Sequence, residues 1–274
     1  MKDIRAALVI SRSPAFQVQQ NLEQTARLSH QAAKQGCAIV CFPEMNITGY
    51  DNSREISQSA QPIPGPASNR LIQVAADENI TVLAGMAEQD HRGRIYASHL
   101  VIRPSGEISV YRKLHIAPPE KEIFSPGDAV SVFEAEGIRF GIQLCYDAHF
   151  PELSTVMAEK GADLIFVPHA SPRGTSEEKF NSWLRHLPAR AYDNSVFVMA
   201  CNQSGDSQKK VNYPGIAMAI DPSGRVMGRK FSQGEALLVT DLRAEELERV
   251  RSHRMRFFLP NRRPGLYKRA MNNS

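Results

Sequence analysis

The feature that most constrains the fold is a continuous apolar run, CAIVCFP, at residues 37–43. A strand that is apolar at every position is buried on both faces, whereas a strand with one wet face alternates apolar and polar residues. A second run, ADLIFVP at residues 162–168, is also expected to form a buried strand. Each run follows a segment with helical spacing of apolar residues, so we expect covering layers around two buried strands.

The remaining pattern alternates strands with helices. Ser13 and Pro14 predict a helix start, and Gly36 predicts its end. Pro188 lies inside another helical segment and is expected to kink or divide it. Strands are expected at residues 4–10, 37–43, 81–88, 94–103, 107–113, 162–168 and 195–201, with a hairpin at 130–145. Helices are expected at residues 14–36, 67–78, 151–160 and 183–194.

Two similar turn segments indicate that the chain has two related halves. They read RPSGEISVYRK at residues 103–113 and DPSGRVMGRK at residues 221–230. Tight turns of this kind join antiparallel strands, whereas the alternating helices favour parallel ones. We therefore predict an α/β fold, a four-layer αββα sandwich of two mixed sheets flanked by helices. No linker divides the halves, so residues 1–274 are interpreted as one domain.

Composition limits the class of protein. The 274 residues are 42% hydrophobic and 23% charged, which is ordinary for a globular protein. No run approaches 18 apolar residues, and the first residues lack a secretory signal, so no membrane association is expected. The four cysteines form no CxxC pair. A reducing cytoplasm is the expected location, and a zinc site at Cys37 and Cys41 is not expected.

A basic tail begins at about residue 249. Charge clusters of this kind can bind nucleic acid, but apolar residues interrupt this one. We therefore expect the tail to pack on its own or a neighbouring subunit, and we expect no nucleic-acid partner. Eight Lys or Arg residues follow Glu248 with no acidic residue among them: Arg249, Arg251, Arg254, Arg256, Arg262, Arg263, Lys268 and Arg269.

Three ionisable residues stand where predicted strands end. They are Glu44 in FPEMNITGY, Lys113 in YRKLH and Cys145 in RFGIQLCYDAHFPE. Strand ends at one edge of a sheet converge, and ligands of open α/β folds bind there. A carboxylate, an ammonium and a thiol are therefore expected to share one pocket.

These three groups suit nucleophilic catalysis. A thiol attacks poorly until it loses its proton, which Glu44 can accept and later return to a leaving amine. Lys113 and the backbone N–H of Tyr146 can stabilise the oxyanion of a tetrahedral intermediate. The product would be a thioester on Cys145, which water then hydrolyses.

The three motifs together resemble the signature of the nitrilase superfamily, the carbon–nitrogen hydrolases. The resemblance extends over nearly the whole chain, including the C-terminal RRPGLY. It implies an αββα sandwich, a Glu–Lys–Cys triad at Glu44, Lys113 and Cys145, and no metal or organic cofactor. It also implies a homodimer or a larger homo-oligomer.

The same resemblance implies a second glutamate between the lysine and the cysteine. Family members commonly place it six residues before a Pro-Gly pair, which selects Glu120 in EKEIFSPGD. Glu122 is the competitor, because amidase-like members place this acid closer to the Pro-Gly. The expected role is to hold Lys113 and to position the attacking water.

Further residues beside these motifs are candidates to line the substrate site. A Cys–His mechanism is the rival, with His115, His149, His169 or His186 as partner, but none lies in a papain-like or caspase-like signature. Arg173 is a candidate to bind an acidic group of the substrate. The predicted substrate-binding residues are Tyr50, His115, Tyr146, His149, His169 and Arg173.

The substrate class follows in part from the nucleophile motif. Nitrilases tend to have Trp-Glu after the cysteine, whereas this chain has Tyr146 and Asp147, which favours amides. Carbamoylases of amino acids often carry Arg four or five residues past the cysteine, where this chain has His149 and Phe150. We predict hydrolysis of a small linear amide or N-carbamoyl amine with release of ammonia. The alternatives are a nitrilase that converts a nitrile to an acid, and a catalytically silent binding protein.

Overall fold

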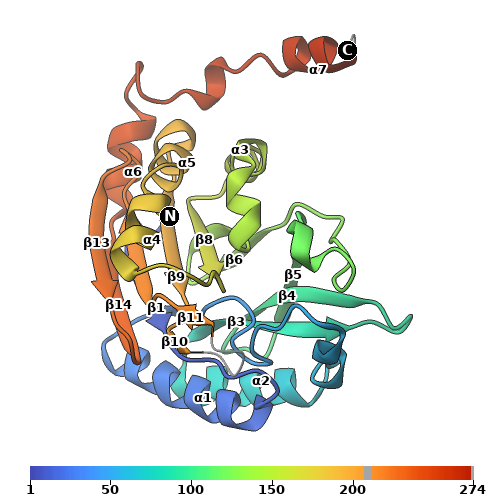
Figure 1. The fold of residues 1–274 in the computed structure, drawn as a ribbon. Helices are drawn as coiled ribbons and strands as arrows, with labels where there is room; N and C mark the ends of the chain where they lie inside the picture. Colours follow the sequence, from blue (N-terminus) through green and yellow to red (C-terminus); the bar gives the residue numbers. More distant parts are fainter. Residues whose placement is uncertain (207–210, 273–274) are drawn as a thin grey trace.

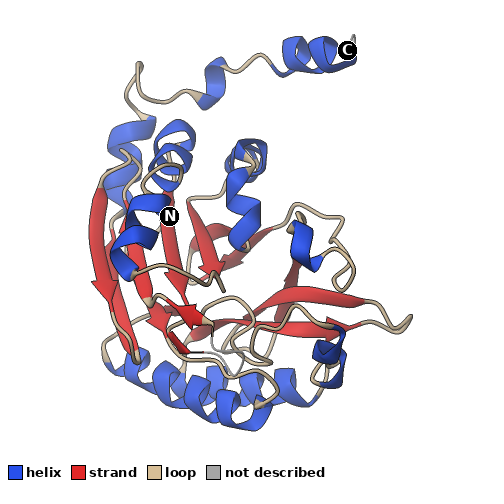
Figure 2. Cartoon of the chain, in the orientation of Figure 1, coloured by secondary structure: helices blue, strands red, loops and turns tan. Residues whose placement is uncertain are grey.

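Two six-stranded sheets pack face to face, with helices on their outer surfaces (Figures 1 and 2). The computed structural model describes residues 1–206 and 211–272. The first sheet has the order β14 (Ala236–Leu242), β1 (Ile4–Ile10), β2 (Ile39–Cys41), β3 (Thr81–Gln89), β4 (Ile95–Ile102) and β5 (Ile108–Arg112). The second has the order β13 (Val226–Phe231), β12 (Ile216–Ile220), β9 (Phe197–Asn202), β8 (Leu164–His169), β7 (Ile138–Ile142) and β6 (Val132–Ala135).

Both sheets are mixed, with parallel strands at the centre and antiparallel strands at the edges. In the first, β2 runs parallel to β1 and β3, and in the second, β8 runs parallel to β7 and β9. Strands β14, β4 and β5 of one sheet, and β6, β12 and β13 of the other, pair antiparallel. The predicted αββα sandwich is confirmed.

Side chains of β1 show why this strand is apolar at every position after the exposed Arg5. Leu8 and Ile10 belong to the core between the sheets, whereas Ala7 and Val9 lie in a second core under the outer helices. Successive side chains of a strand point to opposite faces, so a strand buried on both sides has no solvent position. The outer helices of this sheet are α1 (Val18–Lys34) and α2 (Pro66–Glu78), and those of the other are α3 (Pro151–Glu159), α4 (Ser176–Trp183) and α5 (Leu187–Asn194).

Several element boundaries differ from the predictions, most of all those of the first helix and the second strand. Helix α1 begins at Val18 rather than at residue 14, because Phe16 adopts a left-handed backbone with φ of 66°. Strand β2 covers only residues 39–41. The predicted division at Pro188 is confirmed, since α4 ends at Trp183 and α5 begins at Leu187.

Short elements complete the chain. The two-stranded pair β10 (Gly205–Asp206) and β11 (Asn212–Tyr213) flanks the undescribed residues 207–210. The 3-10 turns are η1 (Arg54–Gln58), η2 (Pro118–Glu120), η3 (Cys145–His149) and η4 (Leu259–Asn261). Within the described ranges, no helix is both long and apolar enough to cross a membrane.

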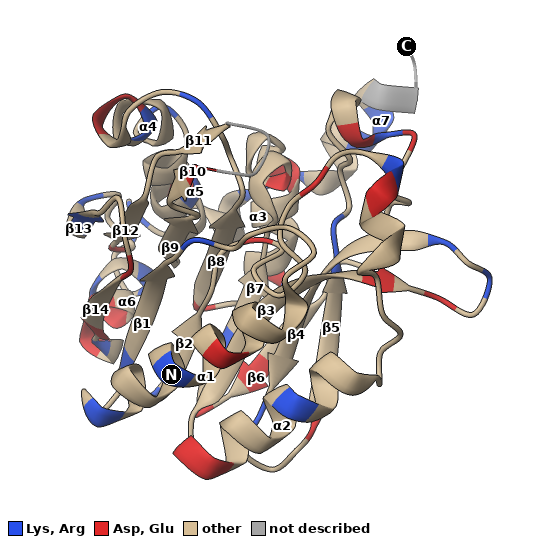
Figure 3. Ribbon diagram, turned by 60° about the horizontal axis from the view of Figure 1, so that its bottom comes forward, with Lys and Arg blue, Asp and Glu red and all other residues tan. Residues whose placement is uncertain are grey.

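The C-terminal tail leaves the sandwich. Helix α6 (Ala244–Arg251) is fastened to it by Arg251, which contacts Asp163 Oδ1 at 2.6 Å and the Ala162 carbonyl at 3.0 Å. The chain then extends through η4 to α7 (Pro264–Asn272), away from both sheets (Figure 1). Met255 on this arm is 75% exposed. Elsewhere, acidic and basic residues are interspersed over the surface elements (Figure 3).

Candidate active site

Cys145 begins η3, directly after β7 and the residues Gln143 and Leu144. Its φ is 44°, a left-handed backbone that residues with a Cβ rarely adopt. Such a conformation persists only where surrounding contacts impose it, and it occurs often at functional sites. The turn leaves Cys145 half-buried, whereas Cys37, Cys41 and Cys201 are buried.

Asp147 supplies the contacts that hold this turn. Its carboxylate is fully buried and accepts hydrogen bonds from the Leu144 backbone N–H at 3.0 Å and the Tyr111 hydroxyl at 2.8 Å. The backbone N–H of His115 donates to it at 2.8 Å, and the His115 ring contacts it at 2.9 Å. The sequence analysis used Asp147 only to favour amides and missed this role. The available signal was its position two residues past the cysteine, where a turn side chain can cap the preceding N–H.

Lys113 joins the two predicted glutamates. Its ammonium lies 2.9 Å from Glu44 Oε1 and 2.9 Å and 3.2 Å from the two oxygens of Glu120. None of the three residues is more than 4% exposed. Glu122, the competitor of Glu120, is exposed. The structure therefore places Glu120, not Glu122, against Lys113.

Glu44 is held by groups from both sheets. It lies three residues beyond β2, and its Oε2 accepts the Ala170 backbone N–H, which follows β8 of the other sheet, at 3.0 Å. Gln203, just after β9, donates to the Glu44 carbonyl at 2.9 Å. The site thus lies where the strand ends of the two sheets meet. The sequence analysis did not identify Gln203.

Burial and neighbouring charges determine the protonation states of Cys145, Glu44 and Lys113. Burial first, and then the Glu44 carboxylate, raise the pKa of the Cys145 thiol to about 12 against the opposing effect of Lys113. Burial also raises the pKa of Glu44, although Lys113 opposes that shift. For Lys113, burial lowers the pKa, but the surrounding acidic groups, Glu44 first, raise it overall. The thiol therefore carries its proton at neutral pH, beside a carboxylate with raised proton affinity.

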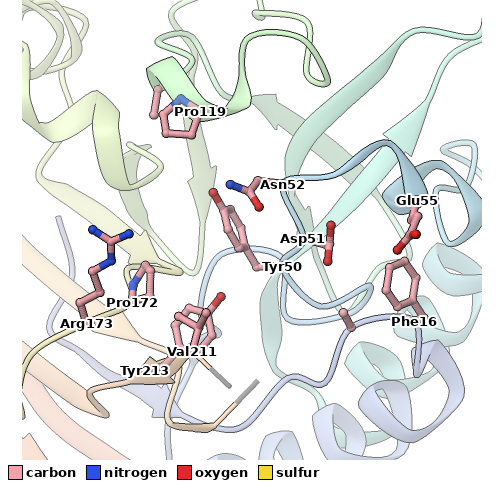
Figure 4. A pocket seen from close by; sticks show the side chains of 12 residues that line it. Phe16, Tyr50, Asp51, Asn52, Glu55, Pro119, Pro172, Arg173, Val211 and Tyr213 are labelled. Atoms are coloured by element: carbon pink, nitrogen blue, oxygen red, sulfur yellow. The ribbon is translucent and has the colours of Figure 1, made fainter. Parts of the chain in front are cut away.

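Tyr50 connects this group to a cavity of about 500 Å³, whose lining side chains are shown in Figure 4. The Tyr50 ring lines the cavity, and its hydroxyl donates to Glu120 Oε1 at 2.7 Å. Pro119, beside Glu120, lines it as well, and so does Arg173. Two predicted substrate-binding residues, Tyr50 and Arg173, thus share one cavity.

The structure does not place the three predicted histidines among the residues that line this cavity. His115 stacks on Phe150 with ring centroids 3.7 Å apart. His149 is exposed and lies over the His186 ring at 4.7 Å. His169 is buried, packs on Trp183 at 4.6 Å, and contacts the Val167 carbonyl through Nδ1 at 2.8 Å. These predictions followed strand ends and did not take into account how η3, α4 and α5 pack together.

The Cys–His rival also lacks geometric support. In the described part of the chain, no hydrogen bond joins a histidine to Cys145. The Tyr146 ring, the remaining candidate, packs edge-on against Phe150 at 5.4 Å. Among residues 1–206 and 211–272, no group of three His, Cys, Asp or Glu residues could hold a metal ion.

The two facing mixed sheets and the Cys145 thiol beside a Glu–Lys–Glu group define a cysteine hydrolase of the αββα type. Residues 5–252 match the family model of carbon-nitrogen hydrolases. The chain belongs to this family, which the sequence motifs had indicated, and it is a hydrolase of carbon–nitrogen bonds other than peptide bonds.

Relatives and solved structures agree with this assignment. An (R)-stereoselective amidase from a Pseudomonas species is 32% identical over 78% of this chain and 76% of its own length. The omega-amidase NIT2 of Xenopus tropicalis is 30% identical over 85% of this chain and 86% of its own. The Nesterenkonia AN1 amidase of the nitrilase superfamily has the same fold, with a TM-score of 0.83 at 24% identity over 97% of this chain and 96% of that one.

Proposed function

We propose that this chain hydrolyses a small linear amide through a thioester on Cys145 and releases ammonia. The observation that supports the proposal best is Lys113, held at 2.9 Å from both Glu44 and Glu120 beside a thiol whose pKa is raised to about 12. Such a thiol needs a base that accepts its proton at the moment of attack. The buried carboxylate of Glu44 is the group to which we assign this role. The amidases among the relatives support the same class of reaction.

In the acylation half, the Cys145 sulfur attacks the amide carbon while its proton passes to Glu44. The carbonyl bond pair moves onto oxygen, where Lys113 and the Tyr146 backbone N–H stabilise the negative charge. When the carbonyl re-forms, the C–N bond breaks, and the nitrogen takes the proton from Glu44. Ammonia leaves, and the acyl group remains on Cys145 as a thioester.

In the deacylation half, water attacks the thioester carbon and gives one proton to Glu44. The second tetrahedral intermediate collapses by breaking the C–S bond, and the departing sulfur recovers the proton from Glu44. The products are the carboxylic acid and the original enzyme. Glu120 fixes Lys113 and helps to orient the water, and the Tyr50 hydroxyl in turn fixes Glu120 at 2.7 Å.

Three further parts of the proposal concern the whole chain. Residues 1–274 form one domain, a proposal supported by the family model over residues 5–252 and by the first sheet, which joins β14 to strands of the first half of the chain. The protein works in a reducing compartment such as the cytoplasm, because oxidation would silence the Cys145 thiol. It assembles as a homodimer or larger homo-oligomer, a state favoured by the apolar residues exposed on the C-terminal arm.

Ammonia release from a panel of short amides, N-carbamoyl amines and nitriles tests the proposal. We expect turnover of amides that is lost in Cys145→Ala and kept in Cys37→Ala, which alters a buried thiol elsewhere in the chain. Activity that survives in Cys145→Ala would refute the nucleophile assignment. Turnover of nitriles with no turnover of amides would instead identify a nitrilase, and no turnover by the wild type would favour a silent binding protein.

A further inference from the structure

His99, on β4, is a buried imidazole that the proposed reaction does not use. It is 0% exposed, and within the described residues neither ring nitrogen has a hydrogen-bond partner. The Leu83 carbonyl lies near the ring, but it already accepts the Phe42 N–H at 2.9 Å and makes no hydrogen bond of ordinary geometry to the imidazole. Burial lowers the pKa of His99 to about 3, so the ring is neutral. A buried polar group without a partner destabilises a fold, so its presence calls for an explanation.

His99 lies beside the residues that fix the nucleophile. Strand β4 is placed between β3 and β5, and the cross-strand partner of His99 on β5 is Tyr111. Residues directly opposite on neighbouring strands share a face of the sheet, and Tyr111 faces the core between the two sheets. The Tyr111 hydroxyl donates to Asp147 at 2.8 Å, and Asp147 accepts the N–H of Leu144, the residue before Cys145.

On its other side, the ring borders the turn that carries Glu44. The cross-strand partner of His99 on β3 is Gly85. A Cβ built on Gly85 would lie 2.5 Å from the Met45 backbone nitrogen and 3.3 Å from the Glu44 carbonyl carbon. The same position is 2.9 Å from His99 Nδ1. The Met45 nitrogen and His99 Nδ1 therefore border one small space, which a glycine leaves open.

The turn at Met45 is strained and needs support. Its φ is 59°, in the left-handed region that residues with a Cβ rarely adopt, and the residue is buried. Such a conformation persists only where neighbouring contacts impose it. Gly85 contacts Asn46 and Ile47 through its N–H and its carbonyl, which fixes the residues after the turn. His99 Nδ1 is an acceptor that borders the turn itself.

We propose that His99 is a positioning residue, whose Nδ1 attracts the Met45 N–H and so fixes Glu44 for proton transfer with Cys145. Hydrogen bonds of a catalytic site are often long in the free enzyme and tighten when substrate binds, so this one forms fully in the complex with substrate. The proton of the neutral ring is then on Nε2. This inference depends on the proposed amidase function and adds a positioning residue to it.

A different role would be to fill the core, and the two roles predict different effects of one substitution. Leucine has a volume similar to that of histidine and brings no polar nitrogen into the core. If His99 only fills space, His99→Leu leaves kcat unchanged. If His99 positions Glu44, the same substitution stabilises the fold and lowers kcat.

The experiment compares kcat and KM for ammonia release from the best amide substrate. His99→Leu removes both ring nitrogens, His99→Asn keeps a polar atom near the Nδ1 position, and His99→Gln keeps one near the Nε2 position. His91→Leu, the same change at an exposed turn, is the control. Urea denaturation above the pH range in which free histidine titrates measures stability. NMR of enzyme with isotopically labelled histidine locates the ring proton of His99 without turnover.

We expect His99→Leu to lower kcat about 10- to 100-fold with KM within about threefold, because a displaced catalytic group costs that much. Its urea midpoint should rise, since no unpartnered nitrogen remains. His99→Asn should keep kcat within about threefold of the wild type, because an acceptor remains near the Nδ1 position. His99→Gln should behave as His99→Leu does, and His91→Leu should match the wild type. NMR should place the proton on Nε2.

Four results would overturn the inference. They are wild-type kcat in His99→Leu, a higher kcat in His99→Gln than in His99→Asn, a ring proton on Nδ1, and losses of kcat and of urea midpoint that are equal in all three His99 variants. Failure of the proposed function would look different, because the wild type itself would then release no ammonia from any amide.

Discussion

At the scale of single residues, the site depends on a left-handed cysteine and on the aspartate that holds it. Asp147 accepts the Leu144 N–H, the Tyr111 hydroxyl and the His115 N–H within 3.0 Å, so its two oxygens act only as acceptors in these three hydrogen bonds. Replacing one oxygen by an NH₂ group turns at least one of these contacts into a donor facing a donor. The geometry of Cys145 and the stability of the fold should therefore change together.

We predict that Asp147→Asn lowers the free energy of unfolding by about 1.5–3 kcal/mol, the usual range for a hydrogen bond to a charged group. It should also lower kcat/KM at least tenfold. Urea denaturation and steady-state kinetics measure the two effects. Tyr111→Phe, which removes only one donor, is the matched control. It should lower both the free energy of unfolding and kcat/KM by less than Asp147→Asn does. Wild-type activity in Asp147→Asn would contradict the positioning role.

The pH dependence of activity also belongs to this scale. Burial raises the pKa of Glu44 above its usual value near 4.5, so the base is lost as the pH falls through that raised pKa. Burial holds the pKa of Cys145 at about 12, so no further gain from thiolate formation is expected near neutrality. The kcat/KM for an amide should rise with pH and then stay level through about pH 9. A maximum near pH 4 would contradict Glu44 as the base.

At the scale of elements, the loop that carries Glu44 packs closely against β3. Gly85 donates its N–H to Asn46 Oδ1 at 2.8 Å, and its carbonyl accepts the Ile47 N–H at 2.9 Å. A Cβ on Gly85 would lie 2.5 Å from the Met45 backbone nitrogen. Neither backbone can move away without breaking these bonds.

We predict that Gly85→Ala costs about 1–3 kcal/mol of stability, as overpacking usually does, and displaces Glu44 enough to reduce kcat. Gly234→Ala is the matched control, because nothing lies within 4 Å of its Cβ position. Thermal unfolding and ammonia release compare the two variants. Equal behaviour of both would show that the close approach at Gly85 does not position Glu44.

The elements were largely predictable from the sequence. A strand that is buried on both faces is marked by a continuous apolar run, and a turn is marked by Pro and Gly residues. The strand-end rule selected Glu44, Lys113 and Cys145, and family spacing selected Glu120, and the structure brings both glutamates against Lys113. The positions of His115, His149 and His169 were not predictable, because they depend on how η3, α4 and α5 pack.

At the scale of the whole molecule, buried histidines link stability to pH. Burial lowers the pKa of His99 to about 3 and that of His169 well below its usual value. In the unfolded chain both take up a proton near pH 6.5. The folded state is therefore at full stability above that pH and loses it as the pH falls toward the folded pKa values.

We predict that the free energy of unfolding falls by about 1.4 kcal/mol per pH unit for each of these two groups below pH 6. His99→Leu should make this slope shallower, whereas His91→Leu, at an exposed turn, should leave it unchanged. Urea titrations at several pH values measure the slope. The same slope in wild type and His99→Leu would contradict a neutral, buried His99.

The C-terminal arm gives a second prediction at this scale. Met255, Phe258, Leu266 and Tyr267 are at least 37% exposed on a segment that leaves the sandwich. If these side chains pack on a second copy, a chain that ends at residue 253 should form smaller assemblies than the full chain. Sedimentation velocity measures this difference. Identical sedimentation of both as monomers would contradict the proposed homo-oligomer.

The most direct test of the central claim is the mass of Cys145 during turnover. Acid quenching of the enzyme with a rapidly hydrolysed amide, followed by peptide mass spectrometry, shows which residue carries the acyl group. We predict that the added mass equals the acyl group, lies on the peptide of Cys145, and disappears as the amide is exhausted. Ammonia release without any acyl group on Cys145, or an acyl group on another residue, would contradict the mechanism.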